Sequence, residues 1–215
     1  MNRLFFFAAI SLILGDSFRV EAQDVDVVLS RLQRKYESTR DLYASFTQIV
    51  RFGVTQNTQT FAGKMWMKKG NRYRIEMEQQ TIVTDGKSVW TYSELNKQVL
   101  IDKFQEDPNS FTPDRVLTNV PQNFFAIIIG NEKVDNVELL VLKLTPKERN
   151  SLTKSMKVWV NSSDWVIGKV EVLDVSDNLT TYRFKDLRIN EGFSDRLFHF
   201  ETPPGAEVVD LRTSQ

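Results

Sequence analysis

Residues 61–78, FAGKMWMKKGNRYRIEME, decide the fold class because apolar and polar side chains alternate on both sides of a turn. In 61–68 the two alternate sets are Phe61, Gly63, Met65, Met67 and Ala62, Lys64, Trp66, Lys68. In 72–78 the apolar set is Tyr73, Ile75 and Met77. Successive side chains of a β-strand point to opposite faces, and Lys69-Gly70-Asn71 supplies turn residues. The stretch therefore predicts a β-hairpin with one apolar face.

The stretch that follows, IVTDGKSVWTY at 82–92, places a carboxylate, a lysine and a serine near two large aromatic rings. It is either part of a catalytic site or a tight turn between two strands. Asp85-Gly86 is a strong hairpin sequence, because a type I′ turn needs positive φ at both central positions. We therefore predict that Asp85 serves a turn and that Trp90 and Tyr92 project together from one face of the next strand.

The rest of the chain continues this strand pattern, with two exceptions. Residues 25–36 have apolar side chains at helical spacing and predict an amphipathic helix. Between 104 and 130 the alternation stops, and Thr112-Pro113-Asp114 and Asn119-Val120-Pro121 each resemble a helix start. We expect two short helices there. The second would carry Phe124, Phe125, Ile127, Ile128 and Ile129.

Further strands are expected at 98–101, 138–145, 154–161, 166–173, 179–187 and 197–200, which gives about nine to eleven antiparallel strands in all. The predicted fold class is mainly β (α+β). It is an incomplete, strongly curved antiparallel β-barrel with an N-terminal helix and a short-helix lid over the concave face.

The start of the chain and its composition suggest an exported protein. Arg3, the apolar run 4–14 and small residues in Val20-Glu21-Ala22 are typical of a signal peptide. We therefore expect residues 1–22 to be removed and 23–215 to form a single domain. The 28 basic residues balance the 28 acidic ones, which speaks against nucleic-acid binding. The chain has no cysteine, and we expect it in the periplasm.

Residues that could carry catalysis or bind a metal are sparse. The only histidine, His199, lies between two phenylalanines, and Ser88 follows a glycine without the second glycine of a nucleophile elbow. We expect no cofactor, no metal site and no enzymatic activity. A hydrolase using Ser88 or another hydroxyl, with His199 as base, is the alternative.

The inward-facing Met and aromatic side chains have two interpretations. They are either an ordinary core or the wall of a site for a ligand without a fixed shape, since the methionine side chain adapts to irregular partners. Composition and periodicity do not decide between these two.

Several stretches together resemble the LolA family of periplasmic lipoprotein carriers. They are SFTQ at 45–48, GKMWMK at 63–68, YR at 73–74, VTDGKSVWTY at 83–92, LTPK at 144–147 and FHFETPPGAEV at 198–208. The resemblance implies an unclosed barrel with a helical lid. It implies a chaperone that accepts triacylated lipoproteins from an inner-membrane ABC-type release complex, shields their acyl chains and delivers them to an outer-membrane acceptor. We expect it to act as a monomer. A carrier or sensor of free lipids or glycolipids with the same fold is the alternative.

The inward-facing Met and aromatic side chains, together with the resemblance, give the candidate site residues. The lipid-binding residues would be Phe46, Met65, Met67, Tyr73, Ile75, Met77, Trp90 and Tyr92. The lid residues would be Lys69, Arg72, Phe124, Phe125 and Ile128. The family usually has Arg-Pro after the Trp-x-Lys strand, where the arginine bonds to the lid, whereas this chain has Lys69-Gly70. Lysine lacks the planar fork of donors, so Arg72 is the candidate to replace it.

Overall fold

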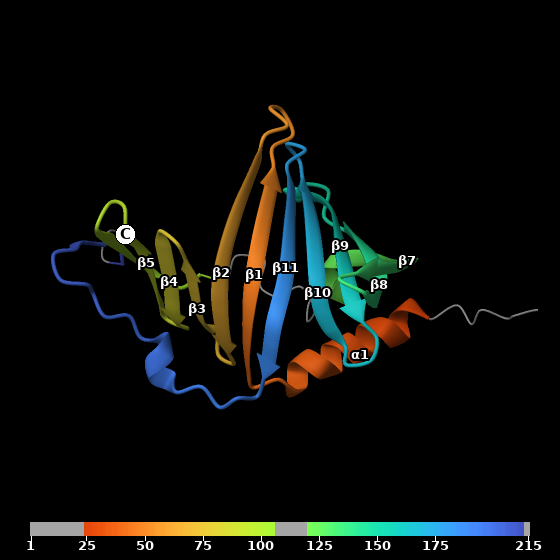
Figure 1. The fold of residues 1–215 in the computed structure, drawn as a ribbon, viewed down its shortest axis with the longest axis horizontal. Helices are drawn as coiled ribbons and strands as arrows, with labels where there is room; N and C mark the ends of the chain where they lie inside the picture. The colour runs from red at the N-terminus through yellow and green to blue at the C-terminus, as the bar shows by residue number, and fades with distance from the viewer. Residues whose placement is uncertain (1–23, 106–119, 213–215) are drawn as a thin grey trace, which may run out of the picture.

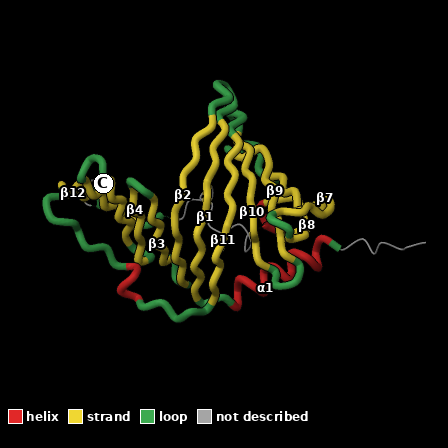
Figure 2. The backbone as a smooth tube through the Cα atoms, viewed as in Figure 1, coloured by secondary structure: helices red, strands yellow, loops and turns green. Residues whose placement is uncertain are grey.

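The described strands of the computed structural model form one open sheet of twelve strands (Figure 1 and Figure 2). The structure describes residues 24–105 and 120–212. The sheet order is β12-β6-β5-β4-β3-β2-β1-β11-β10-β9-β8-β7. The strands are β1 Asp41–Arg51, β2 Thr58–Lys68, β3 Arg72–Met77, β4 Gln80–Asp85, β5 Ser88–Ser93, β6 Gln98–Lys103, β7 Phe124–Val134, β8 Val137–Pro146, β9 Thr153–Asn161, β10 Val166–Asp174, β11 Leu179–Ile189 and β12 Glu207–Asp210.

The sheet is curved but does not close. In Figure 1 the central strands β1 and β11 lie nearest the viewer and both ends of the sheet recede, so the concave face is on the far side. The edge strands β7 and β12 do not pair with each other. The prediction of an unclosed, mainly β structure is confirmed, but the sheet has more strands than expected. Moreover, β12 pairs parallel to β6, whereas every other neighbouring pair in the sheet is antiparallel.

Helix α1, Val25–Ser38, confirms the predicted amphipathic helix. Its N-cap Asp24 accepts a hydrogen bond from the backbone N–H of Asp26 at 3.0 Å, which satisfies one of the free donors of the first turn. The buried side chains are those of Val28, Leu29, Leu32 and Tyr36. They pack into the apolar cluster on the concave face, and α1 lies across one end of the sheet (Figure 1). None of the described helices is both long enough and apolar enough to span a bilayer.

The second predicted short helix is wrong over most of its length. Helix α3 covers only Val120–Asn123, and the following residues 124–134 are strand β7, which pairs with β8. Aromatic and β-branched side chains favour strands, and alternate residues of this run have different surroundings. Phe124, Ala126 and Ile128 pack on the concave cluster, while Phe125, Ile127 and Ile129 are exposed. The other predicted helix, at 112–114, lies outside the described residues.

Two smaller predictions also need correction. The expected strand at 197–200 is instead the 3₁₀ helix η1, Asp195–Phe198, followed by extended chain without a strand partner. The turn after β4 has Gly86 and Lys87 between the paired strands, and only Gly86 has positive φ, so it is not type I′. The Asp85 carboxylate accepts from the backbone N–H groups of Lys87 and Ser88 at 2.8 and 2.9 Å. Asp85 therefore serves the turn, as predicted.

Candidate functional site

One apolar surface extends across the concave face from β3 to β7. Residues directly opposite each other in a sheet share a face, so the strand register traces this surface. One row runs Met77, Gly63, Phe46 and Phe184 over β3, β2, β1 and β11. A neighbouring row runs Tyr182, Val170, Val158, Leu142 and Ile128 over β11 to β7. Apart from Gly63, all residues of both rows belong to a single hydrophobic cluster.

This surface has a buried part and a half-open part. Phe46, Met65 and Met67 are buried in the cluster to which α1 contributes its apolar face. Tyr73, Ile75 and Met77, which lie one strand further out on β3, are only half-buried. The first three residues are therefore core in this structure. The last three offer apolar area that a ligand could cover.

The central β1–β2 contact depends on a glycine. A Cβ atom at Gly63 would lie 2.7 Å from Cζ of the Phe46 ring and 2.5 Å from the carbonyl oxygen of Glu76 on β3. Real Cβ atoms do not come that close to other heavy atoms, so the Phe46 ring packs directly over the Gly63 backbone. The Phe46 ring thus occupies the space that a side chain at position 63 would take.

A hollow of about 540 Å³ lies beside the half-open part, at the end of the sheet away from α1. Its lining includes Gln48, Phe61, Met77, Gln80 and Leu95. This volume lies within the roughly 300–1,000 Å³ usual for small-molecule sites. The described side chains at this end therefore leave space that is accessible from the surface.

The other arm of the concave face was missed by sequence reasoning. The missed side chains lie on β8 to β11, and those at the centre are Leu142, Val158, Val170 and Phe184. Alternation in 138–145 and 179–187 shows which residues share a face of each strand. It does not show that this face meets the one from β3. Only the sheet order brings the two together.

Two polar groups interrupt this surface near its centre. The side-chain amide of Gln48 donates to the Tyr182 hydroxyl at 3.3 Å, and the Tyr182 ring stacks on Phe184 with centroids 6.4 Å apart. Burial raises the pKa of the Tyr182 hydroxyl, which therefore stays protonated and neutral. The centre of the face thus carries no charge from this group.

Trp90 and Tyr92 do not lie on this surface. Register through Ile75, Ile82 and Thr91 places Thr91 on the concave side, so its neighbours on β5 point to the convex side. There Trp90 and Tyr92 pack in a separate cluster with Val83, Val99, Ile101 and Phe200. The structure therefore does not bring these two rings together with the methionines, because alternation along β5 turns them to the opposite face.

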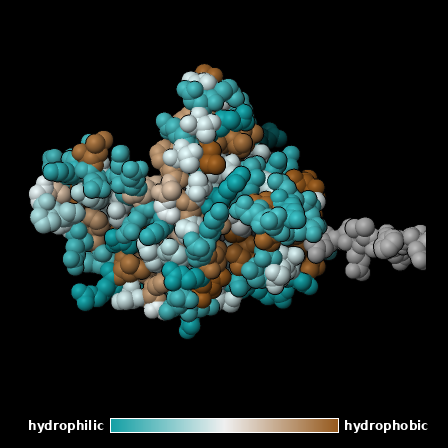
Figure 3. Space-filling view, viewed as in Figure 1, coloured by the Kyte–Doolittle hydropathy of each residue, from teal (hydrophilic) through white to brown (hydrophobic). Residues whose placement is uncertain are grey.

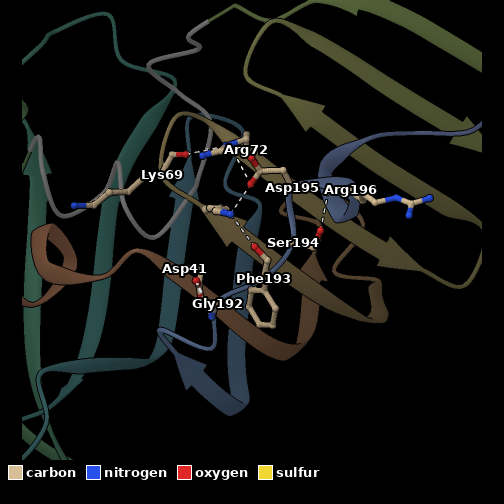
Figure 4. Close-up of polar contacts among 9 residues, drawn as sticks. Asp41, Lys69, Arg72, Gly192, Phe193, Ser194, Asp195 and Arg196 are labelled. Carbon is tan, nitrogen blue, oxygen red and sulfur yellow. Dashed lines mark hydrogen bonds and ion pairs between the residues drawn. The ribbon is translucent and has the colours of Figure 1, made fainter.

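Lys69 and Arg72, the predicted lid contacts, bind other elements among the described residues. The Lys69 ammonium donates to the carbonyl of Glu37 in the last turn of α1 at 2.6 Å. Arg72 pairs with the Asp195 carboxylate of η1 at 2.8 Å, and Lys68 also binds that carboxylate (Figure 4). The hydrogen bond from Lys68, together with Arg72, keeps the pKa of Asp195 below its usual value.

The segment after β11 is held by further polar contacts in the same region (Figure 4). The buried Asp41 carboxylate accepts from the backbone N–H of Gly192 at 3.0 Å. The Lys68 ammonium also donates to the carbonyl of Phe193 at 2.7 Å. Lys68, Lys69 and Arg72 therefore anchor α1 and this segment to β1–β3.

The three predicted apolar lid residues are divided between the two faces of β7. Phe124 and Ile128 pack against the concave cluster, where they lie on the opposite arm from Tyr73 and Ile75. Phe125 points the other way and is exposed, with the Lys147 ammonium 5.4 Å from its ring centroid. They belong to a strand of the sheet and not to a helix above it.

The geometry gives no support to the hydrolase alternative. The Ser88 hydroxyl accepts from the Arg212 guanidinium at 3.1 Å, and the His199 ring packs edge-on against Trp90 with centroids 5.8 Å apart. No hydrogen bond joins Ser88 to His199 in the described part of the chain. Within 24–105 and 120–212, no three acidic, histidine or cysteine side chains are grouped to hold a metal ion.

Comparison with known proteins gives consistent matches. The family model described as outer membrane lipoprotein carrier protein LolA matches residues 37–201. An outer-membrane lipoprotein carrier protein of Actinobacillus pleuropneumoniae serotype 3 is 29% identical over 209 residues, which cover 96% of this chain and 92% of that protein.

An uncharacterized protein of Methanocaldococcus jannaschii is 25% identical over 214 residues, covering 97% of this chain but 61% of the relative. Among solved structures, an uncharacterized conserved protein from Thermus thermophilus matches with a TM-score of 0.58 at 14% identity, over 87% of this chain and 99% of that one. The last match shows a shared fold.

Proposed function

Because this chain belongs to the LolA family, we propose that it is a periplasmic carrier that shields the acyl chains of lipoproteins between two membranes. In this proposal it takes triacylated lipoproteins from an ABC-type release complex of the inner membrane. It then hands them to an acceptor at the outer membrane. The chain performs no covalent chemistry in this role.

The observation that carries the proposal is the half-open apolar surface on the concave face. Tyr73, Ile75 and Met77 on one arm and Phe124 and Ile128 on the other are partly accessible and belong to one apolar cluster. These partly accessible residues therefore adjoin the buried core, and a bound acyl chain would pack against them as a continuation of the core. Phe46, Met65 and Met67 would form the floor beneath such a ligand.

Incomplete burial suits a carrier that must release its cargo. Each methylene moved out of water contributes about 0.8 kcal/mol, so complete burial of several long chains would make the complex nearly irreversible. A face that is open on one side leaves part of each chain in water, or against a second protein. Net affinity is lower as a result, and transfer stays reversible.

The proposal is tested by identifying what the protein carries. The chain would be purified without detergent from the periplasm of cells depleted of their outer-membrane acceptor, and bound species identified by mass spectrometry. We expect polypeptide with attached acyl chains. Acyl ligands without peptide would favour a carrier or sensor of free lipids, because the apolar wall of the described face could hold acyl chains with or without an attached polypeptide. Protein that is empty under these conditions would contradict both.

A further inference from the structure

The most exposed large apolar side chains gather at one end of the sheet. Among the described residues these are Val54 at 91%, Leu95 at 76%, Phe125 at 64% and Leu152 at 60% exposure. They lie in three different turns and at the start of β7, far apart in sequence. Figure 3 shows hydrophobic residues standing out at the tip of the β1–β2 hairpin and at the tip of the turn after β5.

Strand register shows that these positions share one end. Arg51 opposes Thr58 on β2 and Leu179 on β11, which puts turns 52–57 and 175–178 together. Gln80 opposes Ser93, so turn 94–97 is at the same end, and Phe124 opposes Pro146, so loop 147–152 is there too. We call these turns and Phe125 the rim.

Several rim loops are fixed against one another. The backbone N–H of Gly53 donates to the Asn178 side chain at 3.0 Å, and that of Val175 donates to the carbonyl of Leu152 at 3.0 Å. Val175 is itself exposed. Val54, Leu152 and Val175 are therefore carried by turns that are hydrogen-bonded to one another, and their exposure is not the result of a single loose loop.

The rim is also the end at which the hollow beside Met77 lies. Helix α1 lies across the opposite end, where Lys69 binds its last turn and the Tyr36 hydroxyl accepts from the backbone N–H of Ile167 at 3.4 Å. The only described helix at the rim end is the four-residue α3, where the carbonyl of Asn123 accepts from the backbone N–H of Lys147 at 2.8 Å and Val120 is buried in the concave cluster. On the β3–β5 side of this end, the hollow lined by Phe61 and Met77 also contacts Leu95. A ligand leaving the hollow at the rim would pass the apolar tips.

We propose that the rim docks on the surface of a lipid bilayer. The tips are single side chains on separate turns and at the start of β7. The rim and its flanks carry both basic and acidic residues, which are Arg51, Lys97, Lys147, Arg149 and Lys154, and Glu94, Glu148, Asp174 and Asp177, with Lys154 and Asp177 paired at 2.6 Å. Such a mixture suits the interface of a membrane, where apolar side chains enter the acyl boundary and long basic side chains reach the headgroups. A fluid surface accommodates tips of any spacing, whereas a folded partner would need a matching pocket for each.

Docking in this orientation turns this end of the concave face toward the bilayer. Acyl chains passing between the carrier and the release complex or the acceptor would then enter or leave the concave face beside the bilayer. The second step of this inference, the passage of acyl chains, rests on the proposed function. Adsorption of the rim to lipid does not.

Vesicle flotation tests the rim directly. The full chain, purified from the periplasm of an expression host, would be mixed with phosphatidylethanolamine–phosphatidylglycerol vesicles and its partition coefficient measured. Changing Val54→Asp together with Leu152→Asp should lower the coefficient about tenfold or more, because apolar contacts become charged. Val175→Asp and Val208→Asp form a matched pair, since both valines are 48% exposed and only Val175 is on the rim. Val208→Asp should stay within about twofold of the unchanged protein.

A second readout separates this inference from the proposed function. Binding of a fluorescent tripalmitoylated lipopeptide in solution, without vesicles, should be unchanged in the double rim variant. Lipopeptide binding with no vesicle flotation of the unchanged protein would overturn the rim inference and leave the carrier function standing. Flotation of the unchanged protein without lipopeptide binding would contradict the carrier function and leave the rim inference standing. Equal losses in Val175→Asp and Val208→Asp would also overturn the inference.

Discussion

Met77→Glu is the change that most directly tests the concave face as a binding surface. Met77 is half-buried, belongs to the concave cluster and lines the hollow of about 540 Å³. A carboxylate there stays hydrated in the empty protein but must lose water when an acyl chain covers it. Partial exposure limits the penalty to about 2–3 kcal/mol, so acyl binding should weaken roughly 30- to 150-fold.

The assay is titration with a fluorescent tripalmitoylated lipopeptide, accompanied by urea unfolding of each variant. Thr47→Glu is the matched control, because Thr47 is also half-buried and acquires the same charge, but on the convex face. It should bind as the unchanged protein does. Met65→Glu is a contrasting case, since Met65 is buried core, and that variant should lose a large part of the roughly 5–15 kcal/mol typical of domain stability.

The results would refute the reasoning in two ways. If folded Met77→Glu binds the lipopeptide as tightly as the unchanged protein, the acyl chains do not contact this part of the face. If Thr47→Glu loses as much affinity as Met77→Glu, then added negative charge and not its position weakens binding.

Three further predictions concern stability. Lys169→Ala should lower the free energy of urea unfolding by about 2–4 kcal/mol, because it removes the partner of the Glu171 carboxylate. The two groups are 2.8 Å apart, and their side chains are only 10% and 19% exposed. An unchanged urea midpoint would contradict this prediction. Asp195→Asn should make thermal stability less sensitive to acid. The hydrogen bond from Lys68 lowers the pKa of Asp195. The ionised Asp195 therefore stabilises the fold above the usual aspartate pKa, and this stabilisation is lost as pH falls through the lower pKa of the folded state. An equal fall in melting temperature from pH 7 to pH 3 in the variant and the unchanged protein would argue against this prediction. Gly63→Ala should lower the free energy of unfolding by about 1–3 kcal/mol, because the new methyl group would clash with the next strand. Gly168→Ala should lower it less, because the new methyl group would meet only a leucine methyl at 3.3 Å. A larger loss in Gly168→Ala would show that the backbone around Gly63 adapts.

Periodicity in the sequence predicted much of the sheet but not which surfaces meet. Alternation in 61–78 identified the apolar face of β2 and β3, which the structure places on the concave side. The same rule placed Trp90 and Tyr92 on one face of their strand. It could not show that the chain returns after β11 to cover that face with Phe200.

The other errors have similar physical causes. The run 124–129 is apolar at every position, so it has no periodicity that separates a strand from a buried helix, and pairing with β8 decides the outcome. Lys69 was expected to bind a lid because of its place in a family pattern. Its partner in the structure is the end of α1, and no local signal in the sequence predicts a contact between two such separate segments.

The course of the chain between β11 and β12 also limits how the sheet can deform. This segment leaves the centre of the sheet, is tied down at Asp195, and passes over the convex side at Phe200 before β12 pairs with the far edge (Figure 1). Tighter curling of the β3–β6 arm would lengthen the path along the outside. The contacts of the segment at Asp195 and Phe200 would have to shift before this arm could curl further, so they oppose closure of the sheet toward its concave side.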